Sequence, residues 1–456
     1  MLMNNKDNQP EDLLDIMLES EEESESVFNP SAVIQNLNSD QEAAVQNFMN
    51  FMISDSTYYH LTGGAGTGKT FTLKHILDYS LDEYKTACDL LGVKPSINKI
   101  VFTATTNKAA EVLSATLGKE VTTIHNFMGF KVKEDFKTGE TKISVTNNTR
   151  VVSNHLIIID EASMIDKHLF ELLKSYTHNC KFLFVGDHCQ MAPVFEKLSR
   201  IYEQKKYFSN LTLPMRNAGQ PALMVLCAQL RQTVETGVFY PIKEVPGVID
   251  YVDDNTMNNL IDTTFKYQNP TARILAFRNQ QVNKYNKDIR NLRGLPEYFT
   301  DGELLVVGKA YQKGMEKFSV EQQVRVHKNP FIEREKEVQG VKFMVYELVI
   351  DNNYDLIKVE IPSDPVHFES LVKYFANNKN WTAYFHMRQN YPDLRPSDAS
   401  TVYKAQGSTY ETVFVDLEDI SLCTHADQVA RMLYVACSRP KSRLYLYGKL
   451  KPAYGG

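Results

Sequence analysis

The chain has 456 residues, 43% of them hydrophobic and 23% charged, which is typical of a globular protein with two or three domains. No apolar run approaches the roughly 20 residues that a membrane span requires, and the acidic N-terminus predicts neither a signal peptide nor a transit peptide. The net charge of −6 is uneven, because residues 1–28 hold nine acidic side chains and one lysine, so the remainder carries +2. That balance neither requires nor excludes a nucleic-acid partner.

Residues 1–36 are acidic and poor in aromatic side chains. This composition predicts a disordered, solvated tail. An alternative interpretation uses the apolar residues between 13 and 18, which could form a short amphipathic helix that binds a partner protein.

From residue 37 onward, short apolar strands alternate with helices. The first helix is expected to begin near Ser39. The strands expected after it are Tyr58–Leu61, Ile100–Ala104, Leu156–Ile159 and Phe182–Val185, and the further helices are one that ends at Leu77 and Asn107–Leu117. This alternation predicts a parallel sheet covered on both faces, with ligands bound beyond the carboxyl ends of its strands. We place this first domain at 37–215.

The alternation returns later in the chain. The expected elements are strands at Arg273–Phe277, Thr412–Asp416 and Arg443–Tyr447 and helices at Gln280–Leu292 and Ala426–Cys437. They predict a second α/β domain composed of 216–310 and 397–456.

Two segments interrupt these patterns. Residues 311–396 predict an inserted module that is mostly β, with strands at Val324–His327, Phe343–Ile350 and Leu356–Ile361 and a helix at Phe368–Asn377. Residues 129–149 alternate around Thr138-Gly139, which predicts a charged β-hairpin within the first domain.

A glycine-rich loop provides the strongest chemical signal. The sequence Gly63-Gly64-Ala65-Gly66-Thr67-Gly68-Lys69-Thr70 follows a predicted strand and begins a helix. Glycines let backbone N–H groups turn toward phosphate oxygens, and the helix N-terminus adds positive potential. Lys69 is expected to reach the β- and γ-phosphates of a nucleotide, and the Thr70 hydroxyl to bind Mg²⁺.

A pair of carboxylates, Asp160 and Glu161, follows the apolar strand at Leu156–Ile159. In a phosphate-loop protein, one carboxylate at a strand end is expected to hold Mg²⁺ and the second to orient or deprotonate the attacking water. We assign Asp160 to the metal and Glu161 to the water. Arg216 and Arg439 are candidates to stabilise the γ-phosphoryl group from the second domain.

In order and spacing, the motifs of residues 37–447 resemble those of superfamily 1 helicases, most closely the Dda-type phage helicases of the RecD-like branch, superfamily 1B. The matching segments are Leu37–Gln41 (Q motif), 63–70 (motif I), Thr103–Ala110 (Ia), Thr123–His125 (Ib), Asp160–Ser163 (II), Gly186–Val194 (III), Leu211–Arg216 (IV), Ser400–Ser408 (V) and Leu433–Arg439 (VI).

The resemblance implies an ATP-dependent motor of two RecA-like domains, each built on a parallel sheet, with ATP bound between them and single-stranded DNA lying across both. It also implies that the hairpin near 129–149 acts as a pin and that 311–396, including Trp381–His386, is SH3-like. Gln41 would read adenine and Gln190 would sense the γ-phosphate. Core packing is the expected role of Trp381, with DNA contact as the alternative.

The direction of travel also follows from the resemblance. The 3′→5′ branch typically has an aromatic-rich motif III and a tyrosine before the motif IV arginine. Here motif III continues as Met191–Val194, and Met215 precedes Arg216. Both departures favour 5′→3′ translocation.

Residues that could touch the nucleic acid come from motifs Ia, Ib and V and from two aromatic side chains. The candidates are Thr105, Asn107, Lys108, His125, Phe127, Phe136, Thr401 and Lys404. Phe136 could separate the duplex and Phe127 could stack on a base, although an aromatic residue beside a motif is more often part of the core.

The expected partners are single-stranded and forked DNA, together with a replication or single-strand-binding protein at the acidic tail. The protein is expected to be a monomer acting in phage replication, recombination or repair. Its six scattered cysteines include no C-x-x-C pair, which argues against zinc and disulfides and predicts a cytoplasmic location, in the bacterial host if phage-encoded. Three alternatives stay open: a translocase that displaces proteins without unwinding, an RNA helicase, and a scaffold with an inactive nucleotide site.

Overall fold

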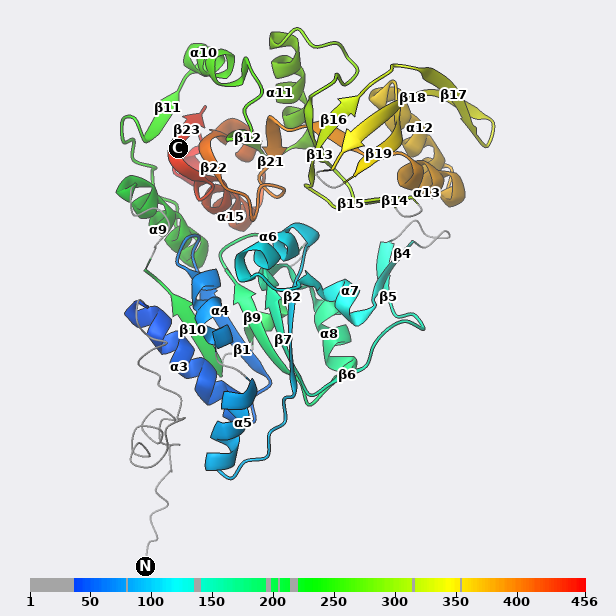
Figure 1. The fold of residues 1–456 in the computed structure, drawn as a ribbon. Helices are drawn as coiled ribbons and strands as arrows, with labels where there is room; N and C mark the ends of the chain where they lie inside the picture. Colours follow the sequence, from blue (N-terminus) through cyan, green and yellow to red (C-terminus); the bar gives the residue numbers. More distant parts are fainter. Residues whose placement is uncertain are drawn as a thin grey trace, which may run out of the picture.

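The computed structural model describes residues 37–78, 81–134, 141–193, 198–203, 206–213, 220–313, 316–352 and 355–456. The acidic tail, Phe136 and Arg216 therefore lie outside the described residues. The chain forms two lobes, one above the other, with a β-rich part beside the upper lobe (Figure 1). Within the described ranges, no helix combines the length and the apolar character needed to cross a membrane.

The lower lobe is built on a six-stranded sheet in the order β10-β1-β9-β7-β2-β3, and every pairing in it is parallel. Its strands are β1 (Tyr58–Gly63), β2 (Lys99–Ala104), β3 (Thr122–Thr123), β7 (His155–Asp160), β9 (Lys181–Gly186) and β10 (Tyr207–Leu211). The helices are α3 (Ser39–Ile53), α4 (Lys69–Asp78), α5 (Leu81–Leu90), α6 (Asn107–Leu117), α7 (Ile124–Met128) and α8 (Lys167–Ser175). A separate parallel pair joins β6 (Val152–Ser153) to β8 (Thr177–His178).

The apolar run of β7 explains why this sheet is covered on both faces. Successive strand residues point to opposite faces, so Leu156 and Ile158 enter the core beneath α3, α4 and α5, whereas Ile157 and Ile159 enter the core beneath α7 and α8. The prediction of a parallel sheet with polar residues after its strands is confirmed for this lobe.

The upper lobe contains a second parallel sheet in the order β11-β23-β22-β12-β21. Its strands are β11 (Ile249–Val252), β12 (Ala272–Ala276), β21 (Ala399–Thr401), β22 (Tyr410–Asp416) and β23 (Pro440–Tyr447). Its helices are α9 (Pro221–Thr236), α10 (Asp254–Phe265), α11 (Asn279–Leu292), α14 (Leu417–Ile420) and α15 (Ala426–Cys437). Buried side chains of α15 pack against those of α9 in one core, so α9 belongs to the upper lobe.

The insertion forms an antiparallel sheet in the order β17-β18-β16-β13-β20, with β19 paired to β18. The strands are β13 (Leu304–Val307), β16 (Gln323–Lys328), β17 (Glu333–Val338), β18 (Val341–Asp351), β19 (Leu356–Pro362) and β20 (Leu394–Pro396), beside a short pair, β14 (Tyr311–Lys313) and β15 (Glu316–Phe318). Helices α12 (Pro365–Asn377) and α13 (Trp381–Asn390) complete it. The sheet takes in β13, which lies before the expected start at 311, and Trp381 opens a helix with its ring edge-on to Tyr384.

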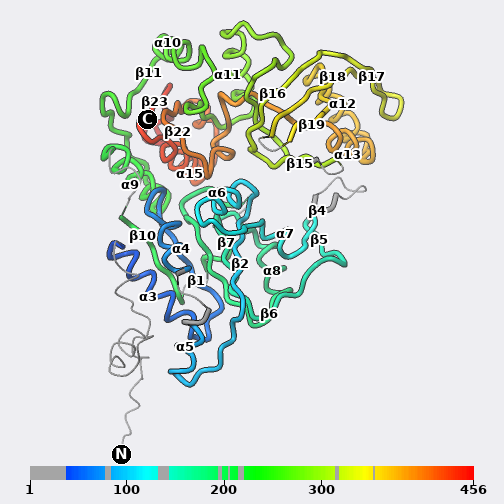
Figure 2. Tube along the Cα trace, in the orientation of Figure 1, coloured from blue at the N-terminus to red at the C-terminus, as the bar shows by residue number. Residues whose placement is uncertain are grey.

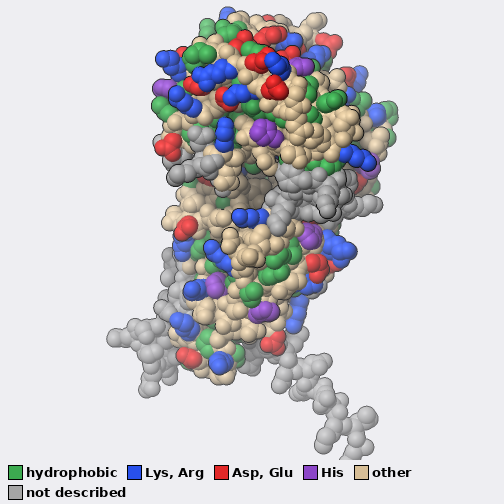
Figure 3. Space-filling view, turned by 90° about the vertical axis from the view of Figure 1, so that its right-hand side faces the viewer, with side chains coloured by type: hydrophobic (Ala, Val, Ile, Leu, Met, Phe, Trp, Pro, Cys, Tyr) green, Lys and Arg blue, Asp and Glu red, His purple; other side chains and the backbone are tan. Residues whose placement is uncertain are grey.

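The predicted hairpin is present as the antiparallel pair β4 (Lys131–Glu134) and β5 (Thr141–Ser144). It extends from the lower lobe on the side where the insertion lies (Figure 2). Figure 3 views that side and shows a hollow at mid-height between the lobes, with Lys, Arg and His side chains on its borders.

Candidate functional site

The phosphate loop connects β1 to α4, and its glycines are required by its shape. Gly66 and Gly68 have φ angles of +78° and +86°, a region that favours glycine. A side chain at Gly63 would place its Cβ 2.5 Å from Thr67 Oγ1. The loop is therefore a tight turn that disfavours side chains at these positions. It directs the N-terminus of α4 toward the space between the lobes.

Lys69 begins α4 and folds over the loop, where its Nζ donates to the carbonyl oxygens of Gly63 at 2.8 Å and Gly64 at 2.9 Å. Burial lowers the pKa of the Lys69 amine, and the carboxylates of Asp187, Glu161 and Asp160 oppose that shift. The positive charge of Lys69 is thus held among three acidic side chains.

Asp160 ends β7, and burial followed by the charge of Glu161 raises its pKa to about 7. Glu161 has a left-handed φ of +51°, which is uncommon for a residue with a side chain and is often found at functional sites. Asp160 and Glu161 are both half-buried, and carboxylate oxygens are the ligands that hard divalent cations prefer, so this strand end fits a divalent metal.

A further acidic group, Asp187, follows β9 and is held by three donors. Its Oδ1 accepts from Arg231 Nη1 at 2.7 Å and from the Cys189 amide at 3.1 Å, and its Oδ2 accepts from the Tyr434 hydroxyl at 2.6 Å. Burial acts to raise the pKa of Asp187, but Arg231 and Lys69 outweigh it and keep the pKa below its usual value.

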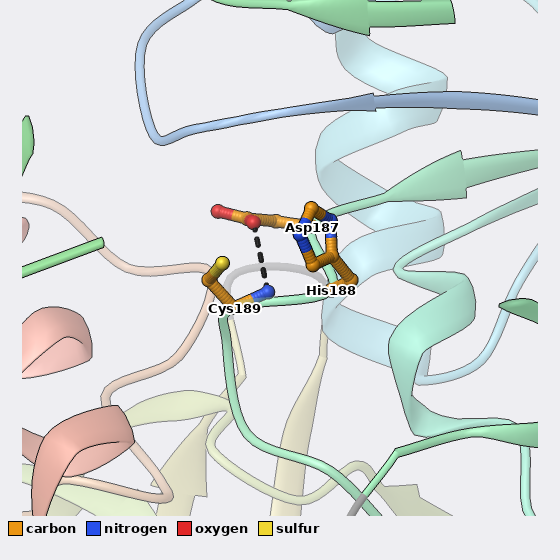
Figure 4. A group of neighbouring side chains, drawn as sticks. All are labelled: Asp187, His188 and Cys189. Atoms are coloured by element: carbon orange, nitrogen blue, oxygen red, sulfur yellow. Dashed lines mark hydrogen bonds between the residues drawn. The ribbon is translucent and has the colours of Figure 1, made fainter. Parts of the chain in front are cut away.

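Asp187, His188 and Cys189 bring three ligand-type atoms within 4.8 Å of one another (Figure 4). This group does not fit a metal ion, because the Asp187 carboxylate is already paired with Arg231. Burial also raises the pKa of the Cys189 thiol, which keeps it protonated, whereas a metal binds the thiolate. We interpret the group as a junction between the lobes.

Arg231 on α9 and Tyr434 on α15 are site residues to which the sequence interpretation assigned no role. Tyr434 accepts the amide hydrogen of Ala65 at 3.1 Å, and a Cβ at Gly64 would lie 3.2 Å from the Tyr434 hydroxyl and 3.6 Å from Arg231 Nη1. Both side chains thus reach the phosphate loop from the upper lobe. Tyr434 lies inside motif VI, but no local pattern marks Arg231.

The Q-motif glutamine, Gln41, is fully buried beneath the loop. Its Nε2 donates to the Thr67 carbonyl at 3.3 Å, and its Oε1 accepts the Asn38 amide hydrogen at 3.1 Å in a capping box of α3. In this arrangement Gln41 supports the loop. Its contact with adenine stays a prediction.

Gln190 and Arg439 differ in how their side chains are engaged. Gln190 is 5% exposed, and its Oε1 has no hydrogen-bond partner among the described residues. Arg439 is 4% exposed, and its guanidinium donates to Val435 O, Ser408 O and Ser438 Oγ at 2.8–3.0 Å. Arg439 thus supports the upper lobe in this structure, and its contact with a γ-phosphate stays a prediction, as does that of Arg216.

The motif Ia residues lie where α6 faces the upper lobe. Thr105 Oγ1 donates to the Glu161 carbonyl at 3.1 Å, and Lys108 Nζ donates to Ser408 Oγ at 2.6 Å. Asn107, the first residue of α6, is exposed. Of these three candidates, Asn107 is the one with its side chain open to a strand.

The remaining candidates for nucleic-acid contact are more buried or are engaged within the protein. His125 is half-buried, and burial lowers its pKa. Phe127 packs beside the core under α7 and lies 6.3 Å from the His155 ring, which favours the core interpretation over stacking. Thr401 is buried, and Lys404 donates to Gly308 O at 3.0 Å.

Comparisons with known proteins match both parts of the chain that form this site. The family model described as an AAA domain matches residues 41–196, and the model described as a UvrD-like helicase C-terminal domain matches residues 396–447. The two matches contain the phosphate loop with Asp187 and the Thr401–Ser408 turn with Tyr434, respectively.

Among curated relatives, the ATP-dependent DNA helicase dda of Enterobacteria phage T4 is 23% identical over 437 residues, covering 84% of this chain and 92% of that protein. The ATP-dependent RecD2 DNA helicase of Deinococcus radiodurans is 30% identical over 135 residues, covering 29% of this chain and 16% of that protein. A solved structure of Pif1 helicase from Bacteroides, in complex with ADP-AlF3 and ssDNA, aligns with 14% identity and a TM-score of 0.49 over 90% of this chain and 92% of that one.

Proposed function

We propose that this chain, an ATP-dependent DNA helicase of the RecD-like superfamily 1B, moves 5′→3′ along single-stranded DNA by closing and opening the cleft beside its phosphate loop. One observation carries the proposed coupling between the lobes: the loop amide of Ala65 is bonded to Tyr434 of the other lobe. A change at the phosphates of a bound nucleotide would therefore act on the upper lobe through this hydrogen bond. A motor needs such coupling between its nucleotide site and its second domain. The direction rests on the resemblance in motifs III and IV.

The chemistry follows from the residues around the loop. Thr70 and Asp160 would hold Mg²⁺, which neutralises phosphate charge when bound. Lys69 would bind the β- and γ-phosphates, and Glu161 would accept a proton from the attacking water. Gln190, Arg216 and Arg439 would respond to the γ-phosphate, as the resemblance implies.

For the strand, we propose a track across α6 and the turn before β22, with Asn107, Lys108 and Lys404 as phosphate contacts. Lys108 of α6 donates to Ser408, which lies in the same turn as Lys404, so both lysines lie near the place where α6 meets this turn. If the two lobes alternate their grip on the strand, each cycle of closing and opening yields one directed step.

The 5′→3′ direction is tested with two duplexes that differ only in having a 5′ or a 3′ single-stranded tail. We expect ATP-dependent strand displacement from the 5′-tailed duplex. Efficient unwinding of only the 3′-tailed duplex would refute the direction.

Two alternative functions share the same motor. A translocase without unwinding activity would displace streptavidin from the biotinylated end of a single strand and leave both tailed duplexes intact. An RNA helicase would be stimulated more by RNA than by DNA oligonucleotides in an ATP hydrolysis assay. We expect stronger stimulation by DNA.

We also propose that the acidic tail binds a replication or single-strand-binding protein, that the enzyme acts as a monomer, and that its setting is the cytoplasm of a phage-infected cell. The first relative above is a phage protein, which supports that setting. A pull-down with and without residues 1–36 tests the tail, and light scattering tests the oligomeric state.

A further inference from the structure

The turn from Thr401 to Ser408 lies between β21 and β22 and faces the end of β7. Val402 and Ala405 anchor it because both are fully buried in the upper-lobe core. Gly407 has a φ of +77°, and a Cβ at that position would lie 4.0 Å from Glu161 Oε1. The turn is thus a fixed part of the upper lobe that approaches the carboxylate expected to activate water.

Gln406 makes the direct contact. Its Nε2 donates to Glu161 Oε2 at 3.4 Å, across the boundary between the lobes. Its Oε1 is buried, and it has no hydrogen-bond partner among the described residues. A buried amide oxygen of this kind requires a donor, and water is the donor that this reaction uses.

Glu161 and Gln406 Oε1 are both acceptors, and one water molecule has two hydrogens to donate. A water that donates one hydrogen to Glu161 and the other to Gln406 Oε1 directs a lone pair away from both. In hydrolysis its oxygen bonds to the γ-phosphorus, the bond from phosphorus to the β–γ bridging oxygen breaks, and a water proton passes to Glu161. Gln406 would then fix the direction of attack, and Glu161 would accept the proton.

The same turn carries the expected contacts to the strand. Lys404 is bonded to Gly308 and paired with Glu321 of the insertion side. Ser408 accepts from Lys108 of α6 and supplies its carbonyl to Arg439. Gln406 lies within the same short turn as Lys404 and Ser408, so a DNA contact made by this turn acts on the segment that holds Gln406.

We propose that Gln406 is a water-positioning residue through which the bound strand stimulates ATP hydrolysis. This inference rests on the proposed function. It assigns to the Gln406 side chain the link between strand binding and ATP hydrolysis. It distinguishes Gln406 from Lys69, whose loss is expected to impair phosphate binding itself.

The test compares wild type with Gln406→Ala, measuring ATP hydrolysis with and without saturating oligo-dT. The expected loss in DNA-stimulated kcat is on the order of 10- to 100-fold. The KM for ATP and the affinity for fluorescent oligo-dT should stay within about 2-fold, because Gln406 orients water and does not hold the phosphates. Gln323→Ala, an exposed glutamine of β16, is the matched control and should behave as wild type.

Gln406→Asn keeps the amide but shortens its reach, so it should fold like wild type and lose a similar share of kcat. This second variant keeps the test valid if the alanine variant unfolds. Unchanged stimulated kcat in the folded variants would overturn the inference, as would a rise in KM with kcat unchanged, which marks a nucleotide contact. If wild type itself showed no stimulation by DNA, the proposed function would fail together with the inference.

Discussion

Tyr434 donates its hydroxyl hydrogen to Asp187 Oδ2 at 2.6 Å and accepts the Ala65 amide hydrogen at 3.1 Å. A single side chain of α15 therefore joins motif III to the phosphate loop. Burial and the charge of Asp187 raise the pKa of the Tyr434 hydroxyl, so it remains a donor at physiological pH. The loop and Asp187 belong to one lobe and Tyr434 belongs to the other. We therefore expect these two hydrogen bonds to couple nucleotide binding to movement of the lobes.

Tyr434→Phe should weaken the coupling between nucleotide and strand, because it removes both hydrogen bonds and keeps the ring. We expect a non-hydrolysable ATP analogue to change the affinity for oligo-dT about 5-fold less than it does in wild type. Fluorescence anisotropy with and without the analogue measures the effect. Tyr447→Phe removes a hydroxyl bonded to Asp254 within the upper lobe and is the matched control. Wild-type coupling in Tyr434→Phe would show that the hydroxyl has no such role.

Asp187→Asn should lower the free energy of unfolding by about 3 kcal/mol, because it leaves the half-buried Arg231 guanidinium without its carboxylate partner. Arg231→Gln alone should also destabilise it, since the Asp187 charge would then be unpaired. The double variant should recover part of the combined loss. Thermal unfolding of the four proteins gives the coupling, and strictly additive losses would mean that the pair is not coupled.

Arg439→Ala should lower stability as well as activity, because its guanidinium serves three buried acceptors. The loss is expected to be about 2–4 kcal/mol, as for other buried networks. In the folded fraction, ATP binding should persist and DNA-stimulated hydrolysis should fall. Titration with a fluorescent nucleotide and differential scanning fluorimetry separate the two effects. Equal loss of binding and hydrolysis would leave Arg439 with a structural role alone.

Lys181 provides a pH-dependent test of the lower lobe. Its Nζ donates to the carbonyl oxygens of Phe51, Ser54 and Ser56 at the end of α3, and burial lowers its pKa to about 8 from 10.5. Between these values the unfolded chain binds more protons at this lysine than the folded chain, so its contribution to stability rises with pH.

Lys181→Met should remove that rise, which is on the order of 2 kcal/mol between about pH 8 and 10.5. It should also lower stability at pH 7, since three carbonyl groups lose a donor. The melting temperatures of both proteins across this range provide the measurement. Parallel curves for wild type and variant would contradict the lowered pKa.

Local sequence was sufficient for much of this fold. The apolar run of β7 and the glycines of the phosphate loop act on their immediate neighbours, so their structure could be predicted from spacing. Helix α9 was not predicted, although Pro221 in its first turn and Gly237 at its end are ordinary boundary signals. The start of the insertion was placed too late, because β13 joins its sheet only through pairing with β16 and β20.

The contacts across the cleft could not be predicted in this way. Tyr434 and Asp187 are 247 residues apart, and Gln406 and Glu161 are 245 residues apart. Motif patterns place such residues near a nucleotide, but they do not state which side chains meet. Arg439 is an example. Its motif implies a contact with phosphate, whereas in this structure its guanidinium donates to groups of the upper lobe.

Strand displacement by wild type and Lys69→Ala, measured on one 5′-tailed duplex at equal occupancy of the tail, tests most directly that this loop drives unwinding. Wild type should displace the strand rapidly only when ATP is present. Lys69→Ala should bind the tail with unchanged affinity, hydrolyse ATP at least 100-fold more slowly and displace no strand. Unwinding by the variant at a wild-type rate, or by wild type without ATP, would show that the phosphate loop does not drive unwinding.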